Sequence, residues 1–181
     1  MEIVHELLKD DEISEFSQVV ITVVNEFSKI DYDEDGYIFV INYASPEQIY
    51  ERKNISNFFV AKYDRKIIGT LEIMNPGNII YDTIINDNGF SLIYDRERYI
   101  LQLFFIEKIF QHKGIGKELL KFAIEYLRSG FPEKKIGIYV HSSTYAEKIY
   151  ESLGFNKIAD IQNIGGVKYF PMVYLEENKS E

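Results

Sequence analysis

The sequence contains no cysteine and no long apolar run, and each absence excludes a class of protein. Without cysteine the chain can form no disulfide, no zinc–thiolate site and no cysteine nucleophile. No apolar stretch approaches the roughly 20 residues that a membrane helix needs, so we expect no membrane partner. An export signal has a basic segment followed by an apolar one, and residues 1–6 do not show this pattern. We therefore expect the protein to work in the cytoplasm.

Positive charge is also scarce, with 20 Lys and Arg residues against 29 Asp and Glu residues and a net charge of −9. Nucleic-acid binding requires a basic face, so we expect no nucleic-acid partner. An acidic protein is compatible with cationic substrates such as amines or polyamines, although net charge does not fix the local potential at a site. The length of 181 residues and the hydrophobic content of 46% fit a single domain, residues 1–181, whose core needs no metal.

Hydrophobic periodicity predicts a succession of helices and strands. It indicates helices over residues 11–30, 114–127 and 145–153 and from Ser45, and strands over residues 58–63, 67–74, 99–106, 135–140, 155–162 and 167–174. Residues 2–8 fit a strand, but periodicity alone leaves a helix start open. We expect an acidic loop at residues 31–36 and a long connection at residues 75–97, with room for a small hairpin. The order predicts a mixed sheet with helices packed against it, in which the segment from 99 to 140 is a parallel crossover.

The segment Gly114-Ile115-Gly116 follows a buried strand and opens an amphipathic helix. The first turn of a helix has backbone N–H groups without an intrahelical partner, and the helix dipole is positive there. Glycines let a diphosphate approach these donors, and Lys113 and Lys117 add positive charge. The alternative is a turn glycine followed by a glycine needed for close packing. Neither a P-loop nor a dinucleotide fingerprint is present, because Leu119 stands where the fingerprint needs its third glycine.

Two motifs together resemble a known family. Gln111-x-x-Gly114-x-Gly116 resembles the [QR]-x-x-G-x-[GA] signature of the GNAT superfamily of N-acetyltransferases. The segment Ala146-x-x-x-Tyr150-x-x-x-Gly154-Phe155 resembles that family's second motif, and 34 residues separate Gly116 from Tyr150. A helix and a strand lie between the motifs, as in the family, and the resemblance extends over residues 57–174.

The resemblance implies a mixed α/β (α+β) fold of the GNAT kind. Its central, mostly antiparallel sheet would have roughly six or seven strands, with a parallel pair that splays apart, and about four flanking helices. Acyl-CoA, here acetyl-CoA as co-substrate, would enter between strands 99–106 and 135–140. The strand backbone would pair with its pantetheine arm and the loop amides with its pyrophosphate. The implied cofactor-binding residues are Phe105, Ile106, Gln111, His112, Lys113, Gly114, Ile115, Gly116, Lys117 and Ser143, the last standing where the family often has asparagine.

Acyl transfer to an amine needs a base for the amine and an acid for the departing thiolate. By resemblance, Tyr150 is the candidate acid, although it also belongs to a core stripe and can simply pack there. Glu107 follows the cleft strand and His141 ends the next one, so either could serve as base. The alternatives are a solvated loop charge for Glu107 and a hydrogen-bonded wall residue for His141. Glu72 is a weaker candidate for binding the amine, and the absence of cysteine favours direct transfer in a ternary complex.

Two functions are compatible with these motifs. The first is an N-acetyltransferase that acts on a primary amine of a small molecule, polyamine or peptide. The second is an acyl-CoA-binding sensor or partner-binding module that kept the fold without turnover. Tyr150 and the intact glycine loop favour the enzyme. Dimers are common in the family and exposed edge strands can pair, so a homodimer stays open.

One further motif is a false lead. Asp31-x-Asp33-x-Asp35-Gly36 matches the start of an EF-hand calcium loop. The twelfth position of that loop needs a bidentate glutamate and holds Asn42 here. We interpret the stretch as an acidic turn near the acceptor entrance and expect no metal.

Overall fold

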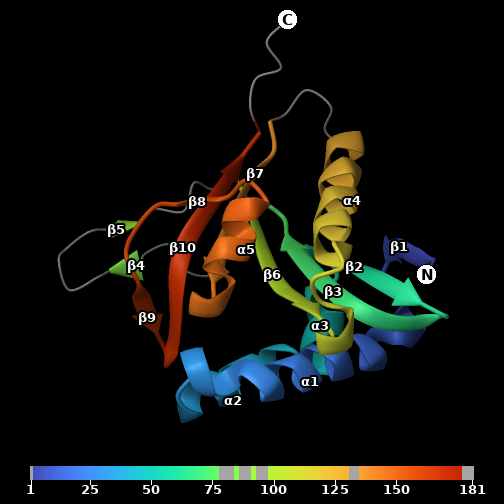
Figure 1. Ribbon diagram of the computed structural model, residues 1–181, viewed down its shortest axis with the longest axis horizontal. Helices are drawn as coiled ribbons and strands as arrows, with labels where there is room; N and C mark the ends of the chain where they lie inside the picture. The colour runs from blue at the N-terminus through green and yellow to red at the C-terminus, as the bar shows by residue number, and fades with distance from the viewer. Residues whose placement is uncertain (1, 78–83, 86–90, 93–97, 131–134, 177–181) are drawn as a thin grey trace, which may run out of the picture.

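The computed structural model describes residues 2–77, 84–85, 91–92, 98–130 and 135–176, and one mixed sheet dominates it (Figure 1). Only the β6–β7 pair is parallel among the described neighbours of this sheet, as the crossover prediction required. A separate short hairpin lies in the 75–97 connection, of which residues 78–83, 86–90 and 93–97 are outside the described residues. The strands of the main sheet run in the order β1 (Ile3–Leu7), β2 (Ser56–Tyr63), β3 (Lys66–Met74), β6 (Tyr99–Ile106), β7 (Gly137–Ser142), β10 (Val167–Leu175) and β8 (Asn156–Lys157). A further strand, β9 (Gln162–Ile164), also pairs with β10. The separate hairpin consists of β4 (Ile84–Ile85) and β5 (Ser91–Leu92).

Helices cover both faces of the sheet (Figure 1). On one face, α4 (Ile115–Gly130) and α5 (Glu147–Ser152) complete a core that includes Leu119, Tyr150 and Phe155. On the other face, α1 (Ile13–Asp31), α2 (Glu34–Tyr43) and α3 (Pro46–Arg52) pack over β2, β3 and β6. None of the described helices is both long enough and apolar enough to span a bilayer.

Most of the predicted elements form where periodicity placed them. The stripe of α1 is buried at Ile13, Phe16, Val20 and Val23, while the side chain of Phe27 lies outside the described residues. Ser45 caps α3 by accepting a 3.4 Å hydrogen bond from the amide of Gln48, and Pro46 stands in the first turn. The sequence therefore determines these elements largely through burial and local capping.

The expected acidic loop at residues 31–36 is wrong, because α2 begins at Glu34. Asp33 caps this helix by accepting a 3.0 Å hydrogen bond from the amide of Gly36. Gly36 lies against the β9–β10 turn, where a Cβ atom would come within 2.4 Å of the Gly166 carbonyl oxygen. The calcium-loop pattern is therefore a helix start, and the described residues contain no group of three or more acidic or histidine side chains placed to hold a metal.

The predicted strand at residues 155–162 is interrupted and forms two short strands, β8 and β9. Both pair with β10, but residues 158–161 leave the ladder. Ile158 still donates its amide to the Pro171 carbonyl over 3.0 Å. Pro171 has no N–H to return that bond, which explains why the pairing stops beside it.

A β-bulge in β6 determines where the sheet opens. β6 pairs with β7 only from Tyr99 to Leu101. On its other side, the pairing with β3 passes from Gln102 to Phe105 while β3 advances by two residues, so β6 holds one extra residue. Leu103 in the bulge has a φ of 45°, and its carbonyl accepts a 2.9 Å hydrogen bond from the buried Thr70 hydroxyl. The last part of β6 consequently has no partner strand on the β7 side among the described residues.

A buried ion pair anchors α3 to the sheet. Arg52 donates two hydrogen bonds of 3.0 Å to the carboxylate of Glu72, which is fully buried in β3. The Ser56 hydroxyl donates a third at 2.7 Å, and the guanidinium lies 3.5 Å from the centre of the Tyr43 ring. The same guanidinium binds the carbonyl of Tyr43, so it fixes the end of α2 as well.

Removing one partner of this pair should destabilise the protein strongly, because it leaves a buried charge without compensation. We expect Arg52→Met to lower the free energy of unfolding by about 3–5 kcal/mol in urea denaturation. Arg52→Met combined with Glu72→Met should lose clearly less. Lys9→Met is the control, since the exposed Lys9–Glu6 pair should contribute less than about 1 kcal/mol. A loss for Arg52→Met no larger than that control would contradict the assignment.

Candidate active site at the parted strands

The loop between β6 and α4 folds back onto the free end of β6. A short 3₁₀ turn, Lys108–Phe110, follows the strand, and the Gln111 side chain donates a 2.8 Å hydrogen bond to the Ile106 carbonyl. The chain then reverses through His112 with a φ of 59° and Gly114 with a φ of 79°. Gln111 therefore holds the loop against the strand, which explains why an amide side chain suits this position.

The first turn of α4 presents backbone donors to open space. The first helical amide with an acceptor in this turn is Glu118, which donates to the Gly114 carbonyl over 3.1 Å, so the preceding amides have no intrahelical acceptor. A Cβ atom on Gly114 would meet nothing within 4 Å, so its φ, and not crowding, calls for glycine. Gly116 is different, because its Cβ would lie 3.3 Å from the Phe104 ring. One glycine shapes the turn and the other brings α4 close to β6, and the geometry suits an anion.

Tyr150 lies beside the parted end of β6 from the α5 side. Its ring centre lies 6.1 Å from Phe104 of β6 and 5.3 Å from Phe155. Burial raises the pKa of the Tyr150 phenol well above its usual value, and the nearby Tyr145 and Tyr32 add to the shift. The hydroxyl makes no hydrogen bond with the described residues. Tyr150 thus belongs to the core and keeps its proton near neutral pH, so core packing does not conflict with the acid role expected from its sequence position.

His141 ends β7, the strand that parts from β6, and its side chain points to the face opposite α4. Its ring centre lies 4.0 Å from that of Tyr169. The side chain keeps an exposed edge, yet the protein around it displaces enough water to lower the pKa of His141 to about 4. Burial also raises the pKa of Tyr169 to about 12. Both groups are therefore uncharged near neutral pH.

Glu107 lies at the far end of β6, beyond Ile106, and its amide donates a 2.9 Å hydrogen bond to the Ile68 carbonyl. Partial burial raises the pKa of its carboxyl, and the nearby Glu15 and Glu26 of α1 raise it further. The structure thus places Glu107 against α1. Tyr150 instead lies against Phe104, at the start of the free part of β6.

Several polar residues are held by contacts that the sequence does not reveal. Thr144 bonds Asp31, and Glu147 bonds Lys157. Glu72 is occupied by Arg52, so it is not available to bind an amine. Ser143 precedes Thr144 and makes no capping bond with its side chain. Burial raises the pKa of Tyr145, and a hydrogen bond with Ser143 acts against that shift. The sequence does not reveal the contact of Asp31, because its partner Thr144 is 113 residues away in the chain.

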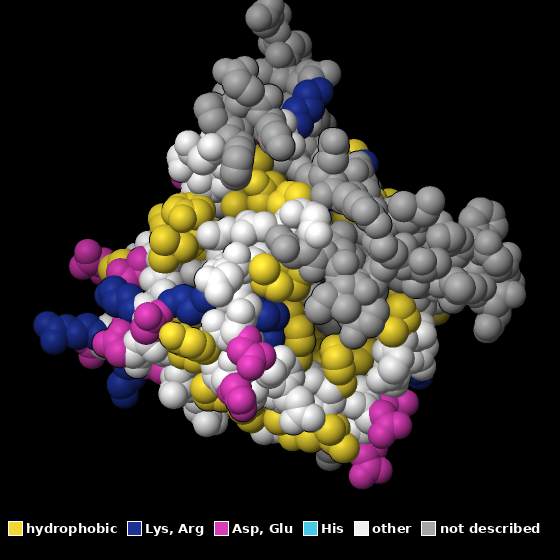
Figure 2. Space-filling view, turned by 180° about the vertical axis from the view of Figure 1, so that it is seen from behind, with side chains coloured by type: hydrophobic (Ala, Val, Ile, Leu, Met, Phe, Trp, Pro, Cys, Tyr) yellow, Lys and Arg dark blue, Asp and Glu magenta, His cyan; other side chains and the backbone are white. Residues whose placement is uncertain are grey.

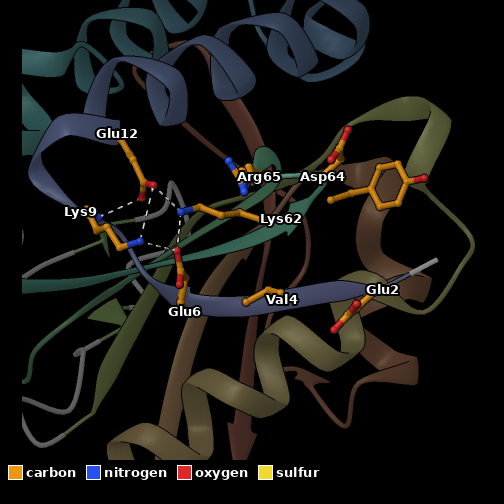
Figure 3. A pocket seen from close by; sticks show the side chains of 9 residues that line it. Glu2, Val4, Glu6, Lys9, Glu12, Lys62, Asp64 and Arg65 are labelled. Atoms are coloured by element: carbon orange, nitrogen blue, oxygen red, sulfur yellow. Dashed lines mark hydrogen bonds and ion pairs between the residues drawn. The ribbon is translucent and has the colours of Figure 1, made fainter.

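A separate groove lies at the β1 edge of the sheet (Figure 3). It measures about 650 Å³ and its charged side chains largely bind one another. Lys62 bonds both Glu6 and Glu12, and Lys9 bonds Glu6. In the sheet, β2 and β3 separate β1 from β6, so this groove is not part of the site at the parted strands.

The lowered pKa of His141 predicts a pH-dependent loss of stability. The pKa of His141 is about 4 in the folded state and 6.5 in the unfolded chain, so the unfolded chain takes up the proton first as pH falls. The stability from a neutral His141 is complete above pH 6.5 and is lost towards pH 4. We expect His141→Gln to show a shallower fall of the urea midpoint over this range than the wild type. Equal slopes would show that the histidine titrates normally.

Comparison with known proteins agrees with this geometry. The family model described as "Acetyltransferase (GNAT) domain" matches residues 28–176. A search of curated proteins found no match. Similar solved structures include PaiA N-acetyltransferase from Thermoplasma acidophilum in complex with coenzyme A, with 19% identity, a TM-score of 0.68 and coverage of 97% of this chain and 100% of that one.

Two others support the same fold. A GNAT-family acetyltransferase from Staphylococcus aureus Mu50 is 17% identical with a TM-score of 0.67, covering 96% of this chain and 99% of that one. PH1933 from Pyrococcus horikoshii is 24% identical with a TM-score of 0.61, covering 97% and 99%. Because the family model matches well over half of the chain, this protein belongs to the GNAT acetyltransferase family.

Proposed function

We propose that the protein is an N-acetyltransferase that moves an acetyl group from acetyl-CoA to a primary amine of a small molecule, polyamine or peptide. One observation carries the proposal. The donor-rich first turn of α4 and the neutral phenol of Tyr150 lie along the same parted strand, with Phe104 in contact with both Gly116 and Tyr150. An anion site beside a proton donor is what a cofactor with a pyrophosphate and a thioester requires.

Several features of the chain fit coenzyme A. The free edge of β6 from Gln102 to Ile106 would offer backbone groups to the pantetheine arm. The amides from His112 to Lys117 would face the pyrophosphate, since the Gln111 amide already donates to the Lys108 carbonyl. Lys113 and Lys117 are exposed beside this turn and supply positive charge. The fold is shared with the Thermoplasma acidophilum protein that was solved with coenzyme A.

The reaction proceeds by direct transfer in a ternary complex. The amine nitrogen attacks the thioester carbonyl carbon, the carbon–sulfur bond breaks, and the sulfur takes the proton of the Tyr150 hydroxyl. Burial disfavours the phenolate, so Tyr150 carries its proton before the reaction begins. The proton lost by the amine passes to His141, which is neutral at the end of β7, or through water to Glu107.

Cofactor binding should depend on the backbone conformation at Gly114. Alanine there is strained at a φ of 79° and would move the turn that carries the amides. We expect wild-type protein to bind coenzyme A in calorimetry and Gly114→Ala to bind it about tenfold more weakly or worse. Gly130→Ala is the matched control, because Gly130 ends the same helix with open space around it. If wild type shows no binding, the proposed cofactor is wrong.

Turnover should depend on Tyr150. We expect wild-type protein to release thiol from acetyl-CoA with at least one member of a panel of small amines, polyamines and peptides. Tyr150→Phe should lower kcat about tenfold or more with little change in coenzyme A affinity, because only the transferable proton is lost. An unchanged rate would remove Tyr150 from the mechanism. Tight binding without thiol release across the panel would instead support an acyl-CoA-binding module.

A further inference from the structure

Three consecutive residues at the α1–α2 junction contact the segment before α5 and the β9–β10 hairpin. The carboxylate of Asp31 binds Thr144, which precedes α5. Tyr32 forms an isolated bridge with Val167 of β10, and the amide of Asp33 donates a 2.9 Å hydrogen bond to the Gly166 carbonyl. The junction thus spans from the helices on one face of the sheet to the segment that carries Tyr150 on the other.

The segment before α5 has no cap of its own. The turn Thr144–Ala146 begins after Ser143, which makes no side-chain capping bond, and the residue before α5, Ala146, has no capping side chain. Asp31 supplies this cap from α1. One carboxylate oxygen accepts from the Thr144 amide over 2.8 Å and the other from the Thr144 hydroxyl over 2.5 Å. Hydrogen bonds to a carboxylate at the start of a helical segment are among the stronger ones in proteins.

Asp31 is buried, so its carboxylate needs hydrogen-bond donors. Its side chain is only 3% exposed, and a buried carboxylate is costly unless it is hydrogen-bonded. The groups around it include the phenols of Tyr32 and Tyr145, whose pKa values are raised first by burial and also by the Asp31 charge. The described residues place no Lys or Arg in an ion pair with Asp31. Thr144 is therefore what keeps this charge satisfied, and the geometry of the Thr144 turn is fixed in return.

We propose that Asp31 is a positioning residue for Tyr150, acting through Thr144 and the start of α5. This rests on the proposed acetyltransferase function. Tyr150 lies on a helix of six residues, too short to hold its own orientation without a fixed start. The Asp31–Thr144 contact fixes that start relative to α1. The Tyr150 hydroxyl is thereby placed beside the end of β6 by a residue that does not touch it.

The test compares Asp31→Asn with Asp35→Asn, which removes the same charge from an exposed site in the first turn of α2. We expect Asp31→Asn to speed hydrogen exchange in the α5 segment, residues 147–153, at least about fivefold while α4 is unaffected. In the same variant kcat should fall about tenfold or more with coenzyme A affinity within about twofold of wild type. Asp35→Asn should change neither measurement.

Substitutions of Thr144 test the same contact from its other side. Thr144→Val removes the hydroxyl bond and should lower kcat, and Thr144→Ser should restore most of that loss because it keeps the oxygen. Faster exchange in α5 with an unchanged kcat would show that Asp31 is merely structural, and unchanged exchange would overturn the capping role. If wild-type protein turns over no amine, the proposed function fails, whereas the exchange measurement still decides whether Asp31 holds α5.

Discussion

The hydrogen bond from Thr70 to the carbonyl of Leu103 secures the constraint on which the site depends. It holds the extra residue of β6 in place. Its effect is visible in the core, where Leu101 and Phe104 both pack on the α4 side although they are three residues apart. In a regular strand, residues three apart point to opposite faces. The bulge therefore shifts the alternation of side chains between the two faces of the sheet by one residue. The pairing with β7 ends at the same place, which opens an edge inside an otherwise continuous sheet.

The opened edge brings the two functional elements together. The loop after β6 returns over the strand end, tied by Gln111, and α4 starts close to Phe104 because Gly116 has no side chain. α5 approaches the same Phe104 through the Tyr150 ring. One aromatic side chain on the freed part of β6 thus touches the helix start suited to an anion and the residue suited to donate a proton. In the proposed mechanism, packing and function would use the same surfaces, so Tyr150 need not be assigned to one or the other.

The sequence predicted those helices and strands in which buried positions recur at the regular spacing of a helix or a strand. The stripe of α1, the β2–β3 hairpin, β6 and α4 have the expected periods. α2 was missed because its residues after Gly36 are apolar except for Asn42, so no amphipathic period marks it, and its acidic start resembles a loop. The interruption between β8 and β9 depends on Pro171 in the opposite strand, which a reading of residues 155–162 alone does not reveal.

The candidate site shows the same division. The glycine loop and Tyr150 are carried by short motifs, so sequence alone locates them. The bulge at Leu103 has no glycine or proline to mark it, and the Asp31–Thr144 contact joins residues 113 positions apart. Such contacts depend on the tertiary arrangement and leave no local pattern. Whether the site residues act as proposed stays a prediction, as does a homodimer.

The structure also changes the meaning of the negative net charge. On the face seen in Figure 2, Asp and Glu side chains are scattered and several lie beside Lys or Arg. Carboxylates such as Glu12, Glu72 and Glu147 bind cations of the chain itself. The acidic composition is therefore weak evidence for a cationic acceptor. The end of β7 instead carries uncharged groups, the imidazole of His141 beside the phenol of Tyr169.

An uncharged environment has a consequence for the proposed reaction. The loss of water that lowers the pKa of His141 to about 4 would act in the same direction on an amine bound beside it. Desolvation disfavours the ammonium form, and only the neutral amine can attack a thioester. A base of low proton affinity is then sufficient, because much of the deprotonation occurs when the amine leaves water. In the proposed mechanism, the selection of a neutral nucleophile would depend on desolvation of the amine more than on a strong base.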